Sequence, residues 1–354
     1  MRKSETDDII YLITKVFLFV NEGRVFLKKT LDSSIVKLTN YRSVWDYIRK
    51  NKQATIPQIS KDIGLSLPTV TRAVDYGVEE GIVEPDGMVG AERGRKAQVY
   101  KLRADYMHFL LIYLDSDVLS YRIHDFRCRT IGSGNMPVCD KNIISTLDKL
   151  VECSAASDPL LSMIAIAVSG VICNGTVVDS AAFPSLSGIN ISERIGQRYS
   201  MTVLIDNDLH VAANVAHLFA NYKEDTNVLY AYGKRKSGSS IIVNGKVLCG
   251  FSGAAGEVEN IPVHTPDIES ERVAFCSERL QAIIALLNPK RVIIYELDEG
   301  MDTDKLISLI KEKLKPYILP DFKTGRDFFE DCFRGLSIMC ELEIKRGLKD
   351  RLDF

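Results

Sequence analysis

Residues 203–214 read VLIDNDLHVAAN, an apolar run that leads directly into an alanine-containing helical segment. The apolar run Val203–Ile205 is followed by Asp206, Asn207 and Asp208, residue types that favour the N-cap of a helix. A strand that passes into a helix in this way is typical of α/β proteins, which bind ligands outside the carboxyl ends of their strands. We therefore expect an α/β body with polar side chains gathered at this strand end.

The same alternation of apolar runs and helical segments continues from Tyr106 to the C-terminus. It predicts an α/β body with largely parallel central strands. The predicted strands are His108–Leu114, Leu119–Asp125, Met163–Val168, Thr202–Ile205, Val228–Tyr232, Ser240–Val243 and Arg291–Tyr295. The predicted helices are Ile143–Cys153, Ile191–Tyr199, Asp208–Ala220, Ser270–Leu287, Thr303–Leu314 and Arg326–Arg346.

A different pattern occupies residues 41–103. Val44–Ile48 opens a helix, Ile56–Ile63 forms a second, Gly64 supplies a turn, and a third helix runs from about Leu67 to Glu80. Ser66 is placed as its N-cap and Pro68 lies in its first turn. Val70, Val74 and Val78 are spaced to face inward, which leaves Thr69, Thr71, Arg72 and Asp75 outside. This order predicts a helix-turn-helix whose last helix enters the major groove of DNA.

A hairpin follows that helix. Ile82–Val83 begins a strand, Asp86–Gly87 is predicted to turn, and Ala97–Leu102 returns, so that residues 91–96 form the tip of a wing. The tip suits phosphate or minor-groove contact. The alternative is a small helical hairpin for protein contacts with residues 93–96 as a solvated loop. The expected DNA-binding residues are Ser66, Thr69, Thr71, Arg72, Arg93, Arg95 and Lys96.

Composition agrees with a basic head on an acidic body. The 354-residue chain has 46% hydrophobic and 26% charged residues and a formal net charge of -2. Residues 41–103 hold eleven basic and eight acidic residues, a net charge of +3, so the remainder carries -5. The eight cysteines lie far apart without a CxxC pair, which indicates reduced thiols and a cytoplasmic location.

The apolar stretch Ile9–Val20 is predicted to be an amphipathic helix. Lys15 interrupts it, acidic residues precede it, and its twelve residues fall short of the ~20 that a membrane span needs. We therefore expect neither a signal peptide nor a membrane partner.

From about Tyr41 onward the chain resembles the ROK family of repressors, open reading frames and sugar kinases. Gly94–Arg95 stands in the wing where the family's repressors carry a Gly-Arg-Pro-like step. Three further places carry the resemblance: the turn within residues 168–177, the Asn-Asp of residues 203–214, and the hairpin 239–246 followed by the Gly-Glu of residues 250–258. The resemblance implies an N-terminal winged helix-turn-helix followed by an actin-like ATPase (ribonuclease H-like) two-lobed body. The implied divisions are a helical extension 1–40, a DNA-binding domain 41–103, lobes 104–222 and 223–325, and a C-terminal helix 326–354 that returns to the first lobe.

The resemblance also implies a sugar site. In the family, an Asp beside the strand end and a Glu after a glycine contact sugar hydroxyls, and these positions are Asp208 and Glu257 here. The expected ligand-binding residues are Gly170, Asn207, Asp208 and Glu257, with the loop Phe183–Gly188 closing over the ligand. Helix capping by Asp206, Asn207 or Asp208 is the alternative, and one residue can cap while its neighbour binds.

Several family features are missing. Where a kinase has Asp-x-Gly-Gly-Thr for phosphate, this chain has Asp115-Ser116-Asp117, whose carboxylates repel a triphosphate. The second phosphate loop is replaced by residues 233–238, GKRKSG, whose basic run could attract an anion or form a solvated hairpin, and the adenosine loop by residues 295–300. Asn260 replaces the family's zinc-binding His, Cys276 stands without a cysteine cluster, and His264 is expected at the surface. We therefore expect no metal, no cofactor and no catalytic residue.

Together these features predict a cytoplasmic transcriptional regulator, acting as a repressor, that binds double-stranded operator DNA. A sugar or sugar derivative in the kinase-like cleft would control it, and a homodimer or higher homo-oligomer would present two heads. Two alternatives stay open: an active sugar kinase with a DNA-binding head, and a ligand-free scaffold that only dimerises the heads. The sequence names neither the sugar, the operator, the sign of regulation, nor the role of the N-terminal extension.

Overall fold

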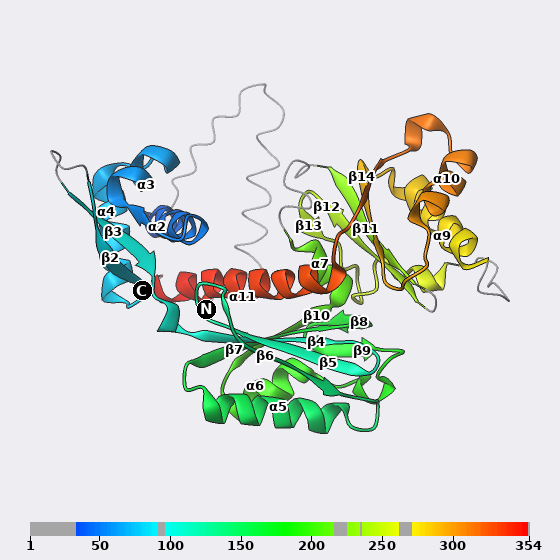
Figure 1. Cartoon of the computed structure of the whole chain (residues 1–354), viewed down its shortest axis with the longest axis horizontal. Helices are drawn as coiled ribbons and strands as arrows, with labels where there is room; N and C mark the ends of the chain where they lie inside the picture. The colour runs from blue at the N-terminus through cyan, green and yellow to red at the C-terminus, as the bar shows by residue number, and fades with distance from the viewer. Residues whose placement is uncertain (1–32, 91–95, 216–224, 234–235, 262–270, 353–354) are drawn as a thin grey trace, which may run out of the picture.

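The computed structural model describes residues 33–90, 96–215, 225–233, 236–261 and 271–352. Figure 1 shows a small head at one end, a body built on two sheets, and one long helix that runs from beside the head toward the second sheet. That helix is α11 (Phe328–Leu352). The helix predicted over Ile9–Val20 lies outside the described residues. Within the described ranges, no helix has the length and hydropathy needed to cross a membrane.

The head consists of three helices and a small sheet with the strand order β1-β3-β2. Thr55 forms a capping box with Gln58, Ser66 accepts from the backbone N–H of Thr69, and Gly64 takes the left-handed conformation between the two short helices. These local signals explain why the predicted bounds of the second helix, Ile56–Ile63, are confirmed. The predicted bounds of the returning strand, Ala97–Leu102, are also confirmed. The elements are α2 (Ser33–Lys50), β1 (Ala54–Thr55), α3 (Ile56–Ile63), α4 (Leu67–Glu79), β2 (Val83–Val89) and β3 (Ala97–Leu102).

Three predictions for the head need correction. Helix α2 spans Ser33–Lys50, so the first helix, predicted to open at Val44, was predicted to start too late. Val70 and Val74 are buried, but Val78 is 41% exposed. Each i+4 step overshoots a helical turn by about 40°, so Val78 has rotated about 80° away from Val70, and Gly77 is buried instead.

The third correction concerns the wing. Asp86–Gly87 does not form the hairpin turn, because β2 continues through both residues with a bulge between Pro85 and Met88. Gly87 has a φ of 86°, which lets the strand bulge and then resume its pairing with β3. The wing strands therefore extend to Val89 and Ala97, and residues 91–95 between them lie outside the described residues.

The first body sheet has the order β10-β7-β4-β5-β6. Parallel pairing joins β10, β7 and β4, whereas β5 and β6 are added antiparallel, so the sheet is mixed rather than largely parallel. Helices α5 and α6 cover one face, and the hairpin β8–β9 extends from the strand ends. The elements are β4 (His108–Leu114), β5 (Val118–His124), β6 (Thr130–Pro137), α5 (Ile143–Ser157), β7 (Leu161–Val168), β8 (Val171–Cys173), β9 (Thr176–Asp179), α6 (Ile191–Tyr199) and β10 (Thr202–Asn207).

The second sheet has the order β13-β12-β11-β14-β15, again with one parallel and one antiparallel side. Helices α9 and α10 pack on one face. Its elements are β11 (Thr226–Tyr232), β12 (Ser237–Val243), β13 (Lys246–Val247), α9 (Arg272–Leu287), β14 (Arg291–Glu296), α10 (Thr303–Lys313) and β15 (Asp321–Thr324). Short 3₁₀ helices occur at Ala104–Tyr106, Pro184–Leu186, Val258–Asn260 and Pro316–Ile318.

The two sheets meet through α11 and the short helix α7 (Asp208–Ala213). One buried cluster joins Phe109 of the first sheet, Val211 of α7, Leu229 of the second sheet, and Phe333 and Leu336 of α11. Helix α7 ends at Ala213 within the described residues, earlier than the predicted Ala220. Because α7 follows β10 directly, this packing places the Asn207–Asp208 pair where the two lobes face each other.

Candidate functional site

A cavity of about 440 Å³ lies between the two lobes. Gly170, Asn207, Asp208 and Glu257 all line it, so the structure brings together the four residues that the sequence assigned to one site. They come from the β7–β8 turn, the β10–α7 junction and the segment after β13. Gly170 has a φ of 147°, and a Cβ atom there would meet the carbonyl oxygen of Asp179 at 2.3 Å, so the turn requires glycine.

Asn207 holds the wall of this cavity together. Its Oδ1 accepts hydrogen bonds from the backbone N–H of Leu209 at 2.8 Å and of His210 at 3.2 Å. Its Nδ2 donates to the carbonyl oxygen of Gly170 at 2.7 Å. Both acceptor positions of the amide are therefore used, and one N–H remains for any further partner. Asn207 is the helix cap, as the alternative interpretation expected, while Asp208 is left facing the cavity.

Asp208 and Glu257 are two carboxyl groups short of donors. Asp208 is 5% exposed, and its side chain accepts a bond only from the backbone N–H of Leu209 at 2.9 Å among the described residues. The half-buried Glu257 side chain has no hydrogen bond or ion pair within the described part of the chain. Burial raises the pKa of both groups, and the charge of Asp208 adds to the rise for Glu257. A ligand that donates hydroxyl hydrogen bonds would satisfy both groups.

Lys236 of the second lobe lines the cavity and forms an ion pair with the first lobe. Its Nζ lies 3.0 Å from Oδ1 of Asp115, which follows β4 of the first sheet. Burial alone would lower the pKa of Lys236, but the carboxylates of Asp115 and Asp208 raise it. Residues 234 and 235 of the same basic run lie outside the described residues. The sequence predicted that the basic run 233–238 either attracts an anion or forms a solvated hairpin. In the structure, Lys236 of this run pairs with Asp115, which stands where a kinase has its first phosphate loop.

A second cavity of about 800 Å³ lies beyond Lys236. Asp115 and Asp117 line it together with further acids from the second lobe and its C-terminal connection, namely Glu296, Asp298 and Asp327. Two cations, Lys236 and Arg326, also line it. Asp115 and Asp117, the two carboxylates that we expected to repel a triphosphate, therefore face the same cavity.

The loop Phe183–Gly188 does not close over the first cavity. Phe183 and Leu186 are fully buried in the core of the first lobe. The backbone N–H of Ser185 donates to Oδ1 of Asp140 at 2.7 Å, and its hydroxyl donates to the Asp140 carbonyl oxygen at 2.8 Å. Burial of an aromatic and a leucine side chain draws this loop inward, so the expected lid is wrong.

The cavity also has a charged wall that sequence reasoning missed. The Arg279 guanidinium, 4% exposed as a residue, lies 2.8 Å from Glu259 and donates to the hydroxyl of Ser237 at 3.0 Å. These partners lie 20 and 42 positions away along the chain, and no short motif marks them. Arg279 neutralises Glu259. Of the other carboxylates that line the cavity, Asp179 is exposed, whereas Asp208 and Glu257 are buried or half-buried and have no ion pair among the described residues.

The residues near the family's zinc site are separated. Cys276 is buried within α9, where its carbonyl oxygen accepts a bond from the Tyr230 hydroxyl at 3.2 Å. Asn260 ends a short 3₁₀ helix beside the cavity, and His264 lies outside the described residues. Over the ranges that the structure describes, no three His, Cys, Asp or Glu side chains come together in a way that could hold a metal ion.

Four of the predicted DNA-binding residues, Ser66, Thr69, Thr71 and Arg72, lie at the N-cap and in the N-terminal half of α4. The Ser66 and Thr69 hydroxyls lie 2.8 Å apart, and the Thr71 hydroxyl donates to the Leu67 carbonyl oxygen at 2.9 Å. Arg72 is exposed and makes no hydrogen bond or ion pair with described residues. Lys96 is exposed at the start of β3, whereas Arg93 and Arg95 lie outside the described residues. Arg72 is thus the described side chain of α4 best placed to donate to an external partner.

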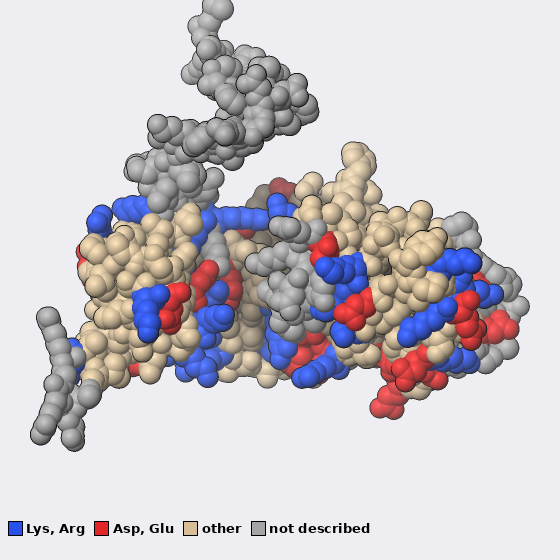
Figure 2. Space-filling model, turned by 90° about the horizontal axis from the view of Figure 1, so that it is seen from above, with Lys and Arg blue, Asp and Glu red and all other residues tan. Residues whose placement is uncertain are grey.

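The wider surface is mixed in charge. Figure 2 shows Lys and Arg side chains interspersed with Asp and Glu along the face in view, rather than covering it. This mixture agrees with the net charge of -2, and on the face in view it leaves room only for local basic patches.

Residues 136–279 match the model of the ROK family. The chain carries a ROK family domain. The match contains Gly170, Asn207, Asp208 and Glu257, and it confirms the resemblance inferred from these motifs.

Repressors are among the curated proteins that this chain resembles. It is 26% identical to the xylose repressor of Caldicellulosiruptor bescii, over 66% of this chain and 61% of that protein. It is 21% identical to the DNA-binding transcriptional dual regulator NagC of Escherichia coli K12, over 65% of this chain and 58% of that protein. The matched region therefore spans less than two thirds of the length of these relatives.

Solved ROK structures share the fold. A ROK family transcriptional regulator described as a homologue of the E. coli MLC protein aligns with a TM-score of 0.63 at 16% identity, over 90% of this chain and 98% of its own. The ROK hexokinase of Thermus thermophilus aligns with a TM-score of 0.54 at 14% identity, over 68% of this chain and 100% of its own. At these identities the likeness establishes a mixed α/β, sugar-kinase-like ROK fold.

Proposed function

We propose that this ROK protein is a sequence-specific DNA-binding transcriptional repressor whose DNA affinity is controlled by a sugar bound between its lobes. The observation that carries the proposal is the meeting of Asp208 and Glu257, two carboxyl groups without sufficient donors, in one interlobe cavity. The names of the relatives support it, since they include xylose repressors and NagC. We place the protein in the cytoplasm, where operator DNA is accessible.

The head is proposed to be a winged helix-turn-helix. The sequence α3, Gly64 turn and α4 provides the helices, and β2 and β3 provide the wing. Helix α4 would enter the major groove with Arg72 toward base edges, while Lys96, with Arg93 and Arg95, would contact the backbone or minor groove. Two heads of a homodimer would read half-sites spaced by about one helical turn of DNA, ~34 Å. The body would be an actin-like two-lobed unit.

The charges of the cavity favour an uncharged sugar over a sugar phosphate. Asp208 and Glu257 face it, and Lys236 is already paired with Asp115. A phosphate charge ~5 Å from either carboxylate would be repelled by roughly 3 kcal/mol at an effective dielectric constant of ~20. Hydroxyl groups, in contrast, donate to both carboxylates.

A thermal-shift series tests the sugar proposal. We expect D-xylose, D-glucose or N-acetylglucosamine to raise the Tm, because a ligand at about 100 times its Kd adds ~2.7 kcal/mol to stability. The 6-phosphates of the two hexoses are expected to give a smaller shift than the free sugars. A flat response to every sugar and sugar phosphate would favour the ligand-free scaffold.

A sugar kinase with a DNA-binding head is the second candidate, because ROK kinases share the fold. Phosphoryl transfer needs backbone donors and a metal around the phosphates. Here the first loop presents Asp115 and Asp117 to the adjoining cavity. We expect ADP release with Mg-ATP and the same three free sugars to stay below ~1 s⁻¹, the low end for kinases. Sugar-dependent turnover above that rate would establish the kinase instead.

A further inference from the structure

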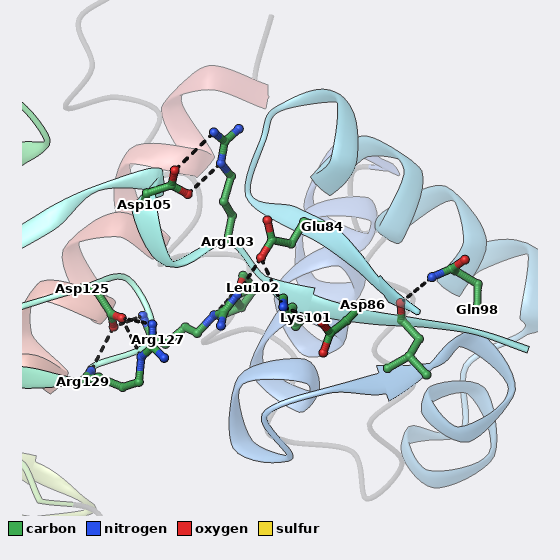
Figure 3. A network of polar contacts seen from close by, with 11 residues as sticks. Glu84, Asp86, Gln98, Lys101, Leu102, Arg103, Asp105, Asp125, Arg127 and Arg129 are labelled. Atoms are coloured by element: carbon green, nitrogen blue, oxygen red, sulfur yellow. Dashed lines mark hydrogen bonds and ion pairs between the residues drawn. The ribbon is translucent and has the colours of Figure 1, made fainter. Parts of the chain in front are cut away.

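Among the described residues, two places outside the connecting segment hold the head to the body, and the first is the turn after β5. Arg127 donates from Nε to the carbonyl oxygen of Leu102 at 2.5 Å and from Nη2 to Glu84 at 2.7 Å. Figure 3 shows this side chain reaching from the body turn to the base of the wing. Both partners lie on the wing strands, so the turn holds the head directly.

The turn that carries Arg127 is itself rigidly held. Asp125, 2% exposed, accepts hydrogen bonds from the backbone N–H groups of Arg127 at 2.9 Å and Arg129 at 3.0 Å. Phe126 packs against Tyr106 at a ring-centroid distance of 4.9 Å and against Phe109 at 6.3 Å. The position of Arg127 therefore follows the position of β5 rather than of a loose loop.

The second joint is the C-terminal half of α11. Glu341 lies 2.5 Å from Nη1 of Arg49 in α2. Ile344 packs against the head core as well as the core between the lobes. Trp45, the only tryptophan of the chain, lines the small cavity at this junction together with Arg49 and Glu341.

The other half of α11 forms part of the interlobe cavity. Phe328 lines it, and the Cys332 thiol donates to the carbonyl oxygen of Asp208 at 3.6 Å. A Cβ atom on Gly335 would meet the Val211 carbonyl oxygen at 2.0 Å, so α11 rests against the backbone of α7. Asp331 accepts from the Tyr295 hydroxyl of the second lobe at 2.6 Å. One helix thus contacts the Asp208 segment, the second lobe and the head.

Three cross-links join β5 and the turn after it to α11 along this path. Arg122 pairs with Glu330, with its Nη1 at 3.0 Å, and its guanidinium lies 4.2 Å from the Phe333 ring centroid. His124 and Ser337 are 2.9 Å apart, and the Cys128 thiol donates to Glu341 at 3.3 Å. Burial lowers the pKa of His124 to about 4, so the ring is neutral at physiological pH and hydrogen-bonds without charge. Strand and helix are therefore expected to move together.

We propose that β5 and α11 form one unit that carries the state of the interlobe cavity to the DNA-binding head, with Arg127 and Glu341 as the positioning residues at its two joints. The inference rests on the proposed function, because it assumes that the cavity takes an effector. A ligand that draws the second lobe toward the first would shift the second lobe relative to the first sheet and α7, and α11 contacts all three. Such coupling requires the ligand to favour one arrangement of the head over another.

Trp45 makes the proposal measurable, since it is a single fluorophore at the junction. Calorimetry with D-xylose, D-glucose and N-acetylglucosamine first identifies a sugar that binds. In the wild-type protein, that sugar should change Trp45 emission and change DNA affinity by about 5- to 150-fold. The Arg127→Met and Glu341→Gln proteins should bind the sugar within about twofold of wild type, while the change in DNA affinity falls below about fivefold.

Arg129→Met is the matched control. Arg129 lies in the same turn, is 61% exposed and bonds to Asp125 rather than to the head. It should keep both the emission change and the DNA response. Wild-type responses in both Arg127→Met and Glu341→Gln would overturn the proposal while leaving the sugar site intact. If no sugar binds in calorimetry, the sugar part of the proposed function fails and this inference falls with it.

Discussion

Calorimetry should show that an Asp208→Asn protein binds its sugar about 5- to 150-fold more weakly than wild type, a loss of ~1 to 3 kcal/mol. Asp208 is buried beside the cavity with its own Leu209 N–H as donor, so a sugar hydroxyl would supply the missing charge-assisted bond. Asparagine keeps the shape and removes the charge. Glu257→Gln should act in the same direction, and exposed Asp304→Asn on α10 should have no effect.

Stability separates ligand contact from helix capping in these variants. Burial raises the folded-state pKa of Asp208 above its ordinary value, so the ionised group opposes folding at neutral pH. Stability should therefore rise as the pH falls through that pKa, and Asp208→Asn should be at least as stable as wild type at pH 7. Asn caps a helix about as well as Asp, so loss of capping is tested at the cap itself: Asn207→Ala should lower stability by about 1 kcal/mol. If both Asp208→Asn and Glu257→Gln bind the sugar with wild-type affinity, the sugar does not bind in this cavity.

Replacing Arg72 by Ala should reduce operator affinity by ~1 to 3 kcal/mol and relax sequence preference, as expected for a side chain that reads a base. Arg72 is exposed on α4 without a hydrogen bond or ion pair to described residues, so its guanidinium is available. Adding Thr69→Ala should weaken binding further if that hydroxyl turns away from Ser66 toward DNA.

Arg95→Ala, in the wing, should affect DNA binding differently from Arg72→Ala in α4. A residue that contacts phosphate should weaken binding to all sequences alike and lower the salt dependence by about one ion. Fluorescence anisotropy with operator and scrambled duplexes at several salt concentrations distinguishes the two effects. Specific binding that is unchanged in Thr69→Ala/Arg72→Ala would rule out α4 as the recognition helix.

Local signals account for most of what the sequence predicted. The helix Ile56–Ile63 follows from its cap and from Gly64, and the strand ends of a parallel sheet bring Asp208 into the cleft. Strand β6, with the sequence TIGSGNMP, was missed because it lacks an apolar alternation and lies at an edge. The sequence predicts a hairpin turn at Asp86–Gly87, where the structure has a β-bulge, because an Asp-Gly pair is compatible with either conformation.

Long-range pairs account for the rest. Lys236 meets Asp115 from 121 positions away, and Cys128 meets Glu341 from 213 positions away. No spacing along the chain indicates such contacts, which depend on how the lobes and α11 pack. The same limit applies to Phe183, whose burial in the core only tertiary packing decides.

The most direct test of the proposed repressor function is an anisotropy titration of operator DNA with and without the sugar that gives the largest thermal shift. The operator can be obtained by selection from random duplexes with the full chain. The account predicts tight, sequence-dependent binding that the sugar weakens by about 5- to 150-fold in the wild-type protein and much less in Asp208→Asn. Operator affinity that is the same with and without a sugar shown to bind the protein would contradict it.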